Sequence, residues 1–296
     1  MPLSGLRAIL TRSRHQGGEL SGLLATAALQ APPTPAALWS APRLALVEQL
    51  WDEGYTSPGG AAELLRLAAP LGLSAASSLL LLGAEAGGPA FSLANEQGAW
   101  VAAHEAVAEL RERAALRIQH AGTALARRAT VSAWDPAAPS FRRRYFHHAI
   151  AREALRDGVA EPILAAIAAS LKPHGQLVLV ETTAAQRLDA ADPTIAAWCR
   201  LEGREPLLPA EDTITRMLGR LGFEVRVVED LSPRQTRLAL LGWKRLVREL
   251  ATSRPEPGQA GLVVAEAELW LHRIQLMQQG RIRLLRWHAI LNAAGA

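Results

Sequence analysis

The sequence is poor in cysteine, lysine and tyrosine. Its single cysteine, Cys199, excludes an internal disulfide framework and a cysteine-rich zinc module, and it fits a reducing compartment. Eight histidines are scattered without the spacing of a metal-binding motif, so we expect no metal site. Lys172 and Lys244 are the only lysines among the 32 basic residues, so arginine supplies nearly all of the positive charge.

Long apolar runs are also missing. No stretch approaches the roughly 20 residues that a membrane-spanning helix needs. Residues 1–18 lack the continuous apolar core of a secretory signal. The chain of 296 residues is 49% hydrophobic and 20% charged, which is typical of a globular protein. We therefore expect a cytoplasmic protein without a membrane span.

Short apolar segments alternate with helical patterns through most of the chain. The alternation predicts an α/β fold with a doubly wound, mostly parallel sheet. The predicted strands are 77–82, 99–104, 129–134, 145–151, 176–181, 223–229 and 281–290.

Proline content and helical patterning indicate the domain organisation. Four prolines in residues 31–42 separate an N-terminal helical arm and linker, residues 1–38, from the main domain, residues 39–296. Within that domain, residues 231–279 read as a helical insertion before the last strand, and they include an amphipathic helix suited to cover a pocket.

A glycine-rich turn, Gly83-Ala84-Glu85-Ala86-Gly87-Gly88, follows the first predicted strand. In doubly wound sheets, ligands bind beyond the carboxyl ends of the strands. A dinucleotide fingerprint would need glycine in place of Glu85, whose bulk and negative charge oppose a pyrophosphate. A triphosphate-binding loop is absent as well. A cationic ligand without phosphates, such as S-adenosylmethionine, tolerates these acids.

Glu105 follows the second predicted strand, about 20 residues after the glycine turn, where doubly wound folds place an acid for a ribose diol. The alternative is an ordinary surface glutamate in the first turn of a helix, where the helix dipole favours a negative charge.

Three segments resemble one enzyme family. "LLLLGAEAGGPAFSLA", "LKPHGQLVLVE" and "DEGYTSPGG" are similar to motifs of the class I S-adenosylmethionine-dependent methyltransferases. The similarity is to the small-molecule branch, which contains phosphoethanolamine, sarcosine/dimethylglycine and sterol methyltransferases. This resemblance implies a Rossmann-like, doubly wound sheet of seven strands, S-adenosylmethionine as cofactor and a small-molecule acceptor.

The resemblance also implies roles for individual residues. Gly83, Gly87 and Gly88 would line the methionine part of the cofactor. Glu105 would bind the ribose, and Asp135 would lie beside the adenine.

Tyr55 and Ser57 would close over the cofactor from the N-terminal side, although Tyr55 could instead be a buried anchor of its loop. Motif I of the family is degenerate, because Leu81 replaces its aspartate and Glu85 one of its glycines. The family's strand-four aspartate falls at His147.

Glu153, after the fourth predicted strand, is the candidate catalytic base, with an ordinary helix-start acid as the alternative. We expect a methyltransferase acting on a small molecule. We consider an anionic acceptor because basic residues exceed acidic ones from residue 231 onward. The alternative is a catalytically inactive methyltransferase-like protein that serves as a binding or scaffold module. An RNA methyltransferase is less favoured, so we expect no nucleic-acid partner.

Overall fold

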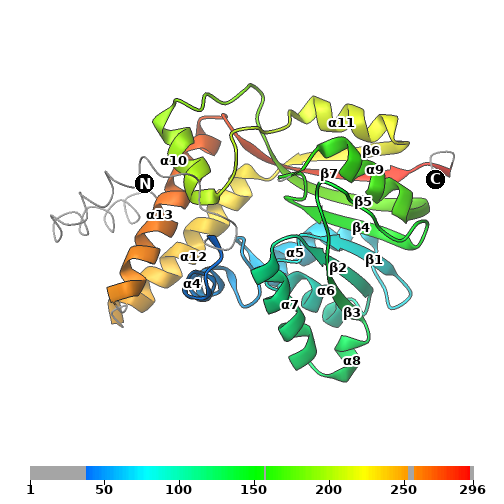
Figure 1. Cartoon of the computed structure of the whole chain (residues 1–296), viewed down its shortest axis with the longest axis horizontal. Coiled ribbons are helices and arrows are strands. Elements are labelled where there is room, and N and C mark those ends of the chain that lie inside the picture. The colour runs from blue at the N-terminus through cyan, green and yellow to red at the C-terminus, as the bar shows by residue number, and fades with distance from the viewer. Residues whose placement is uncertain (1–37, 157, 253–256, 294–296) are drawn as a thin grey trace.

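The computed structural model describes residues 38–156, 158–252 and 257–293. Its centre is a sheet of seven strands in the order β3-β2-β1-β4-β5-β7-β6 (Figure 1). The predicted doubly wound α/β sheet of seven strands is confirmed. The strands are β1 (Ser78–Leu82), β2 (Trp100–Glu105), β3 (Ala129–Ala133), β4 (Phe146–Arg152), β5 (Leu171–Thr183), β6 (Phe223–Asp230) and β7 (Arg283–Leu291).

The strand order reverses direction between β1 and β4. From β1 the chain builds outward through β2 to β3, and it then crosses back to place β4 on the other side of β1. The strands from β1 to β5 pair in parallel, whereas β7 runs antiparallel between β5 and β6. The four leucines at 79–82 are fully buried because helices cover both faces of the sheet.

Helices cover the two faces of the sheet in two groups. Residues of α9 and α11 pack on one face, and residues of α5, α6 and α7 pack on the other. The helices are α4 (Ala41–Trp51), α5 (Gly60–Ala68), α6 (Gly88–Glu96), α7 (Ala108–His120), α8 (Thr123–Ala126), α9 (Ala160–Ser170), α10 (Pro193–Glu202), α11 (Glu211–Arg220), α12 (Ser232–Thr252) and α13 (Pro257–Gln278).

Four helices, α4, α10, α12 and α13, gather beside the sheet on the left of Figure 1. The insertion expected at 231–279 supplies α12 and α13. The rings of Trp51 on α4 and Trp270 on α13 meet edge to face, with centroids 5.0 Å apart. Of the predicted N-terminal arm, residues 1–38, only Leu38 lies inside the described residues.

Helix α10 is not among the elements predicted from the sequence. Its start nevertheless carries a recognisable signal, because the Asp192 carboxylate accepts hydrogen bonds from the backbone N–H groups of Thr194 and Ile195, with Pro193 in the first turn. In the described residues, none of the helices combines the length and the apolar character that crossing a bilayer requires.

Candidate functional site

A cavity of about 220 Å³ lies at the carboxyl ends of the parallel strands, beside the reversal between β1 and β4. The turn after β1, the end of β2 and the end of β4 form one side. Helix α13 forms another side through Leu269, Trp270 and Arg273. This is the edge of a doubly wound sheet where ligands are expected to bind.

The three glycines of the turn after β1 differ in what they contact. Gly83 has φ +80° and lines the cavity, and a Cβ there would lie 2.4 Å from the carbonyl oxygen of Arg152. Gly87 and Gly88 do not border the cavity. A Cβ would strike Ala114 of α7 at the former position and the ring of Tyr55 at the latter. Of these three glycines, Gly83 alone lines the cavity.

Glu85 has a left-handed backbone, with φ +53°, and its carboxylate is held from three directions. Oε2 accepts a hydrogen bond of 2.5 Å from the backbone N–H of Thr56, and Oε1 accepts one of 3.0 Å from the Ser57 hydroxyl. Oε1 also lies 2.6 Å from Nη1 of Arg152. The segment at 56–57 is thereby held against the turn, and Ser57 lines the cavity.

Glu105 ends β2 and lines the cavity. Its Oε2 accepts a hydrogen bond of 2.9 Å from the N–H of Glu85, and Oε1 accepts one of 3.1 Å from the N–H of Val107. Burial raises the pKa of Glu105 to about 7. Within the described residues this carboxylate forms no ion pair, which separates it from the other acids that line the cavity.

Besides Gly87 and Gly88, two more residues predicted to bind the cofactor do not line the cavity. Asp135 is exposed, and its carboxylate accepts a hydrogen bond from the N–H of Ala137, although its neighbours Trp134 and Pro136 both line the cavity. Tyr55 is 3% exposed, and its hydroxyl lies 2.7 Å from that of Ser92. Its geometry is that of the loop anchor considered as the alternative.

His147 lies at the start of β4, at the opposite end of the strand from the cavity. Its Nδ1 accepts a hydrogen bond from the N–H of Ser78, at the start of β1, and its Nε2 lies 2.8 Å from Nζ of Lys172. The residue of β4 that does reach the cavity is Arg152, the last residue of the strand.

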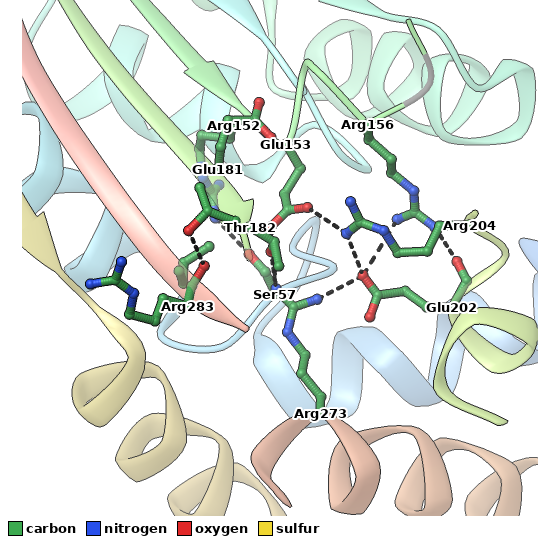
Figure 2. A network of polar contacts seen from close by, with 12 residues as sticks. Ser57, Arg152, Glu153, Arg156, Glu181, Thr182, Glu202, Arg204, Arg273 and Arg283 are labelled. Carbon is green, nitrogen blue, oxygen red and sulfur yellow. Dashed lines mark hydrogen bonds and ion pairs between the residues drawn. The ribbon is translucent and has the colours of Figure 1, made fainter. Parts of the chain in front are cut away.

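Glu153 follows β4 and also lines the cavity. Figure 2 shows its carboxylate beside the guanidinium groups of Arg204 and Arg273, at 3.3 Å and 3.2 Å. The hydroxyl of Thr182 donates a hydrogen bond of 2.5 Å to it. Burial raises its pKa, but Arg273 and Arg204 outweigh burial, so the pKa lies below its ordinary value. The carboxylate is therefore ionised and well supplied with donors.

Glu202, at the end of α10, joins the same cluster. It lies 2.7 Å from Arg273 and 3.4 Å from Arg204. Burial opposes its ionisation, but Arg273, Arg204 and Arg156 outweigh burial and lower its pKa to about 2. Two glutamates and two arginines thus form a largely buried charge cluster in the wall of the cavity (Figure 2). We call Glu153, Glu202, Arg204 and Arg273 the charge cluster.

The pKa of Glu181, on β5, is shifted in the direction opposite to those of Glu153 and Glu202. Burial and the neighbouring Glu153 raise its pKa well above the ordinary value. Its Oε1 accepts a hydrogen bond of 2.8 Å from the N–H of Leu155. This contact fixes the turn in which Glu153 sits with φ +49°.

The sequence did not reveal Arg152, Glu202, Arg204 or Arg273 as site residues. The Asp192-Pro193 pair would have predicted α10, and Gly203, with φ +66° after its last residue, would have predicted its end. A helix predicted from these two signals would end next to Glu202 and Arg204. Nothing in the local sequence pairs them with Arg273, about 70 residues further on.

No protein-family model matches the sequence, and no curated protein matches it either. Solved structures do match. A Haemonchus contortus phosphoethanolamine N-methyltransferase 2 superposes with a TM-score of 0.72 at 18% identity, over 84% of this chain and 57% of that one. The chain therefore spans little more than half the length of that enzyme.

Two further structures match over most of their length. A putative sarcosine dimethylglycine methyltransferase from Galdieria sulphuraria has a TM-score of 0.64 at 15% identity, over 79% of this chain and 85% of that one. The [4+2]-cyclase SpnF has a TM-score of 0.65 at 18% identity, over 88% and 98%. Together with the strand order, these likenesses confirm the predicted resemblance in fold. The chain has the fold of the class I S-adenosylmethionine-dependent methyltransferases.

Proposed function

We propose that this protein binds S-adenosylmethionine in the cavity and transfers its methyl group to a small-molecule acceptor. The observation that carries the proposal is that Gly83 and Glu105, which end neighbouring parallel strands, line one cavity at the reversal of the sheet. The similarly folded Haemonchus contortus enzyme was crystallised with S-adenosylmethionine and with S-adenosylhomocysteine, which supports the choice of cofactor.

The chain's own residues suit parts of this cofactor. The Glu105 carboxylate, which no arginine neutralises within the described residues, would accept hydrogen bonds from a ribose diol. The missing side chain of Gly83 lets a ligand approach the backbone there. We assign contact with the adenine to Trp134 and Pro136, because these two line the cavity while the Asp135 carboxylate faces solvent.

When bound, the cofactor supplies an electrophilic methyl group on a sulfonium. The protein's part is then to hold the acceptor in line with it, and orientation alone provides much of the acceleration. Glu153 remains the candidate base, since it lines the cavity. Its lowered pKa suits it to remove only an acidic proton, so an acceptor with a free lone pair would need no base at all.

A second candidate is a binding module without methyltransferase activity. Two observations favour it. The cavity of about 220 Å³ is smaller than the roughly 300–1,000 Å³ typical of ligand pockets, so a cofactor and an acceptor together require it to widen. The Glu85 carboxylate is also tied down beside Gly83, where the family has glycine. The name of SpnF, a cyclase, illustrates that one fold carries more than one chemistry.

Isothermal titration with S-adenosylmethionine and S-adenosylhomocysteine tests the proposal. We expect both ligands to bind the wild type, and Glu105→Gln to weaken both by roughly tenfold or more, since a charged acceptor is lost. Glu109→Gln, in the first turn of α7 and outside the cavity, is the matched control. Absence of binding at millimolar ligand would refute the proposal.

Transfer of a labelled methyl group to the small molecules of a cell extract separates the two candidates. We expect labelled product with the wild type. Cofactor binding without transfer to any acceptor would favour the binding module. A site gained only after Glu85→Gly would favour it too, because that substitution removes the carboxylate tied down in the turn.

A further inference from the structure

We infer that Arg152 and Glu85 together bind an α-amino-acid group. Arg152 would bind its carboxylate and Glu85 its ammonium. The inference rests on the proposed function, because S-adenosylmethionine carries such a group at its methionine end. It assigns a ligand contact to Arg152, and it gives the glutamate in the glycine turn a role in binding rather than in blocking.

Both side chains border the cavity next to Gly83. They are 13% and 10% exposed, so a ligand in the cavity would meet them largely desolvated. Nη2 of Arg152 donates a hydrogen bond of 2.6 Å to the Ser57 hydroxyl, and the same hydroxyl donates to Glu85. The two charged groups are thus held in fixed positions before any ligand arrives.

One atom of this arrangement lacks a hydrogen-bond partner. Nη1 of Arg152 is buried and within 2.6 Å of Oε1 of Glu85, yet it makes no hydrogen bond of acceptable geometry. A buried N–H group without an acceptor is costly. A carboxylate oxygen placed in the cavity would satisfy it with a charge-assisted hydrogen bond.

The other arginines of the cavity wall are engaged elsewhere, and Arg156 among them donates a hydrogen bond to the carbonyl oxygen of Glu202. Arg43 pairs with Glu266 at 2.9 Å, and Arg273 is held in the charge cluster. The strand that leads into the turn offers only the buried leucines at 79–82. Beside Gly83, the polar groups available to an amino-acid end are therefore those of the Glu85–Arg152 pair and its Ser57 bridge.

A zwitterion fits this pair better than a single charge does. An ammonium beside Glu85 and a carboxylate beside Arg152 would complete a ring of four alternating charges, in which each charge has two neighbours of opposite sign. The amino-acid group itself adds no net charge to the buried pair, so neither protein group is left uncompensated. A lone anion or a lone cation would instead compete with the existing pair.

Three ligands that share the adenosyl part separate these contacts. S-adenosylmethionine has both charged groups and a sulfonium, its decarboxylated form keeps the ammonium and the sulfonium, and 5′-methylthioadenosine has none of these charges. For Arg152→Met we expect titration to give roughly tenfold or more weaker binding of S-adenosylmethionine, with binding of the decarboxylated form unchanged or tighter. For Glu85→Gln we expect S-adenosylhomocysteine, which has the ammonium but no sulfonium, to bind more weakly and methylthioadenosine, which has neither, to bind as before.

Controls keep the experiment decisive. Arg66→Met removes an arginine that is paired with Glu63 outside the cavity, and it should alter no affinity. The double variant Glu85→Gln/Arg152→Met leaves no unpaired charge in the turn, and it should bind S-adenosylhomocysteine and methylthioadenosine, which both lack the sulfonium, about equally. Retained binding of methylthioadenosine reports that each variant is folded.

Two results overturn the inference in different ways. If the wild type binds all three ligands but Arg152→Met weakens S-adenosylmethionine and its decarboxylated form equally, Arg152 has only a structural role and the proposed function survives. If the wild type binds none of the three, the proposed function fails and the inference fails with it.

Discussion

Arg273 on α13 and Glu202 at the end of α10 form an ion pair of 2.7 Å between side chains that are 9% and 8% exposed. The same guanidinium reaches Glu153 at 3.2 Å and donates a hydrogen bond of 2.9 Å to the hydroxyl of Thr182 on β5 (Figure 2). One side chain of the helical insertion is therefore fastened both to a neighbouring helix and to the carboxyl end of the central sheet.

Replacing Arg273 with methionine should strongly destabilise the protein. The substitution leaves Glu202 and Glu153 buried with fewer compensating charges, and breaking such a pair typically costs about 3–5 kcal/mol. Chemical denaturation measures the change in unfolding free energy. A matched control is Arg216→Gln, because the pair between Arg216 and Asp212 is mostly exposed and should contribute little. Equal effects of the two substitutions would contradict a structural role for the charge cluster.

The raised pKa of Glu105 predicts a pH dependence of stability. The group titrates near 7 in the folded protein and near 4.5 when unfolded, so between these values the folded state holds a proton that the unfolded state lacks. The unfolding free energy should therefore fall as pH rises from about 4.5 to 7, and Glu105→Gln should flatten that part of the profile. Denaturation of both proteins at pH 5, 6, 7 and 8 checks this. Parallel profiles would contradict it.

Affinity should depend on pH in the opposite sense. A ribose diol donates hydrogen bonds to the ionised carboxylate, so cofactor binding should strengthen from pH 6 to 8 as Glu105 loses its proton. Titration at several pH values measures the change. In Glu105→Gln the remaining affinity should vary little over this range, and a wild-type profile without a rise near pH 7 would count against ribose binding by this residue.

Gly83→Ala tests the close contact between Gly83 and the backbone of Arg152. The new Cβ would lie 2.4 Å from the carbonyl oxygen of Arg152, in addition to the strain of a left-handed alanine. Gly72→Ala isolates the strain, because Gly72 is left-handed, with φ +57° and ψ +42°, but has open space around its Cβ position. We expect Gly72→Ala to cost about 1 kcal/mol of unfolding free energy and Gly83→Ala clearly more. Similar costs for the two substitutions would contradict this expectation, because they would mean that the turn after β1 shifts freely to relieve the contact.

Tyr55→Phe separates a loop anchor from a cofactor ligand. Burial raises the pKa of Tyr55 to about 12, so its hydroxyl stays protonated and bonded to Ser92. Removing it should cost about 1 kcal/mol of unfolding free energy and leave cofactor affinity unchanged. Ser57→Ala, which alters a cavity-lining hydroxyl, should weaken binding instead. A loss of affinity in Tyr55→Phe would restore the role predicted from the resemblance.

The fold could be predicted because its strands are short, apolar and separated by helices, so local patterning is enough to define it. The segment at 176–181 illustrates this, as its four central residues are buried in β5. The ends of the strands were predicted less accurately than their existence. β5 begins at Leu171, five residues before its predicted start, because the chain continues to pair with β4 around His174 in a left-handed conformation. Proline and glycine in that stretch suggested a break.

The candidate site was harder to predict, since its contacts join distant parts of the chain. Glu105 and Gly83 could be located from the strand ends alone. Arg152 could not, because the resemblance drew attention to His147 and the carboxyl end of β4 lies five residues further on. The partner of Glu85 is likewise fixed only by the pairing of β1 with β4, which no local pattern encodes.

The position of β7 has a consequence for synthesis of the protein on the ribosome. Residues 283–291 complete the sheet between β5 and β6, and they are made after both of these strands. Until they emerge, β5 lacks its antiparallel neighbour and β6 has no strand to pair with. A nascent chain that stalls before residue 283 would therefore expose two open edges at once, which makes it a natural client for chaperones.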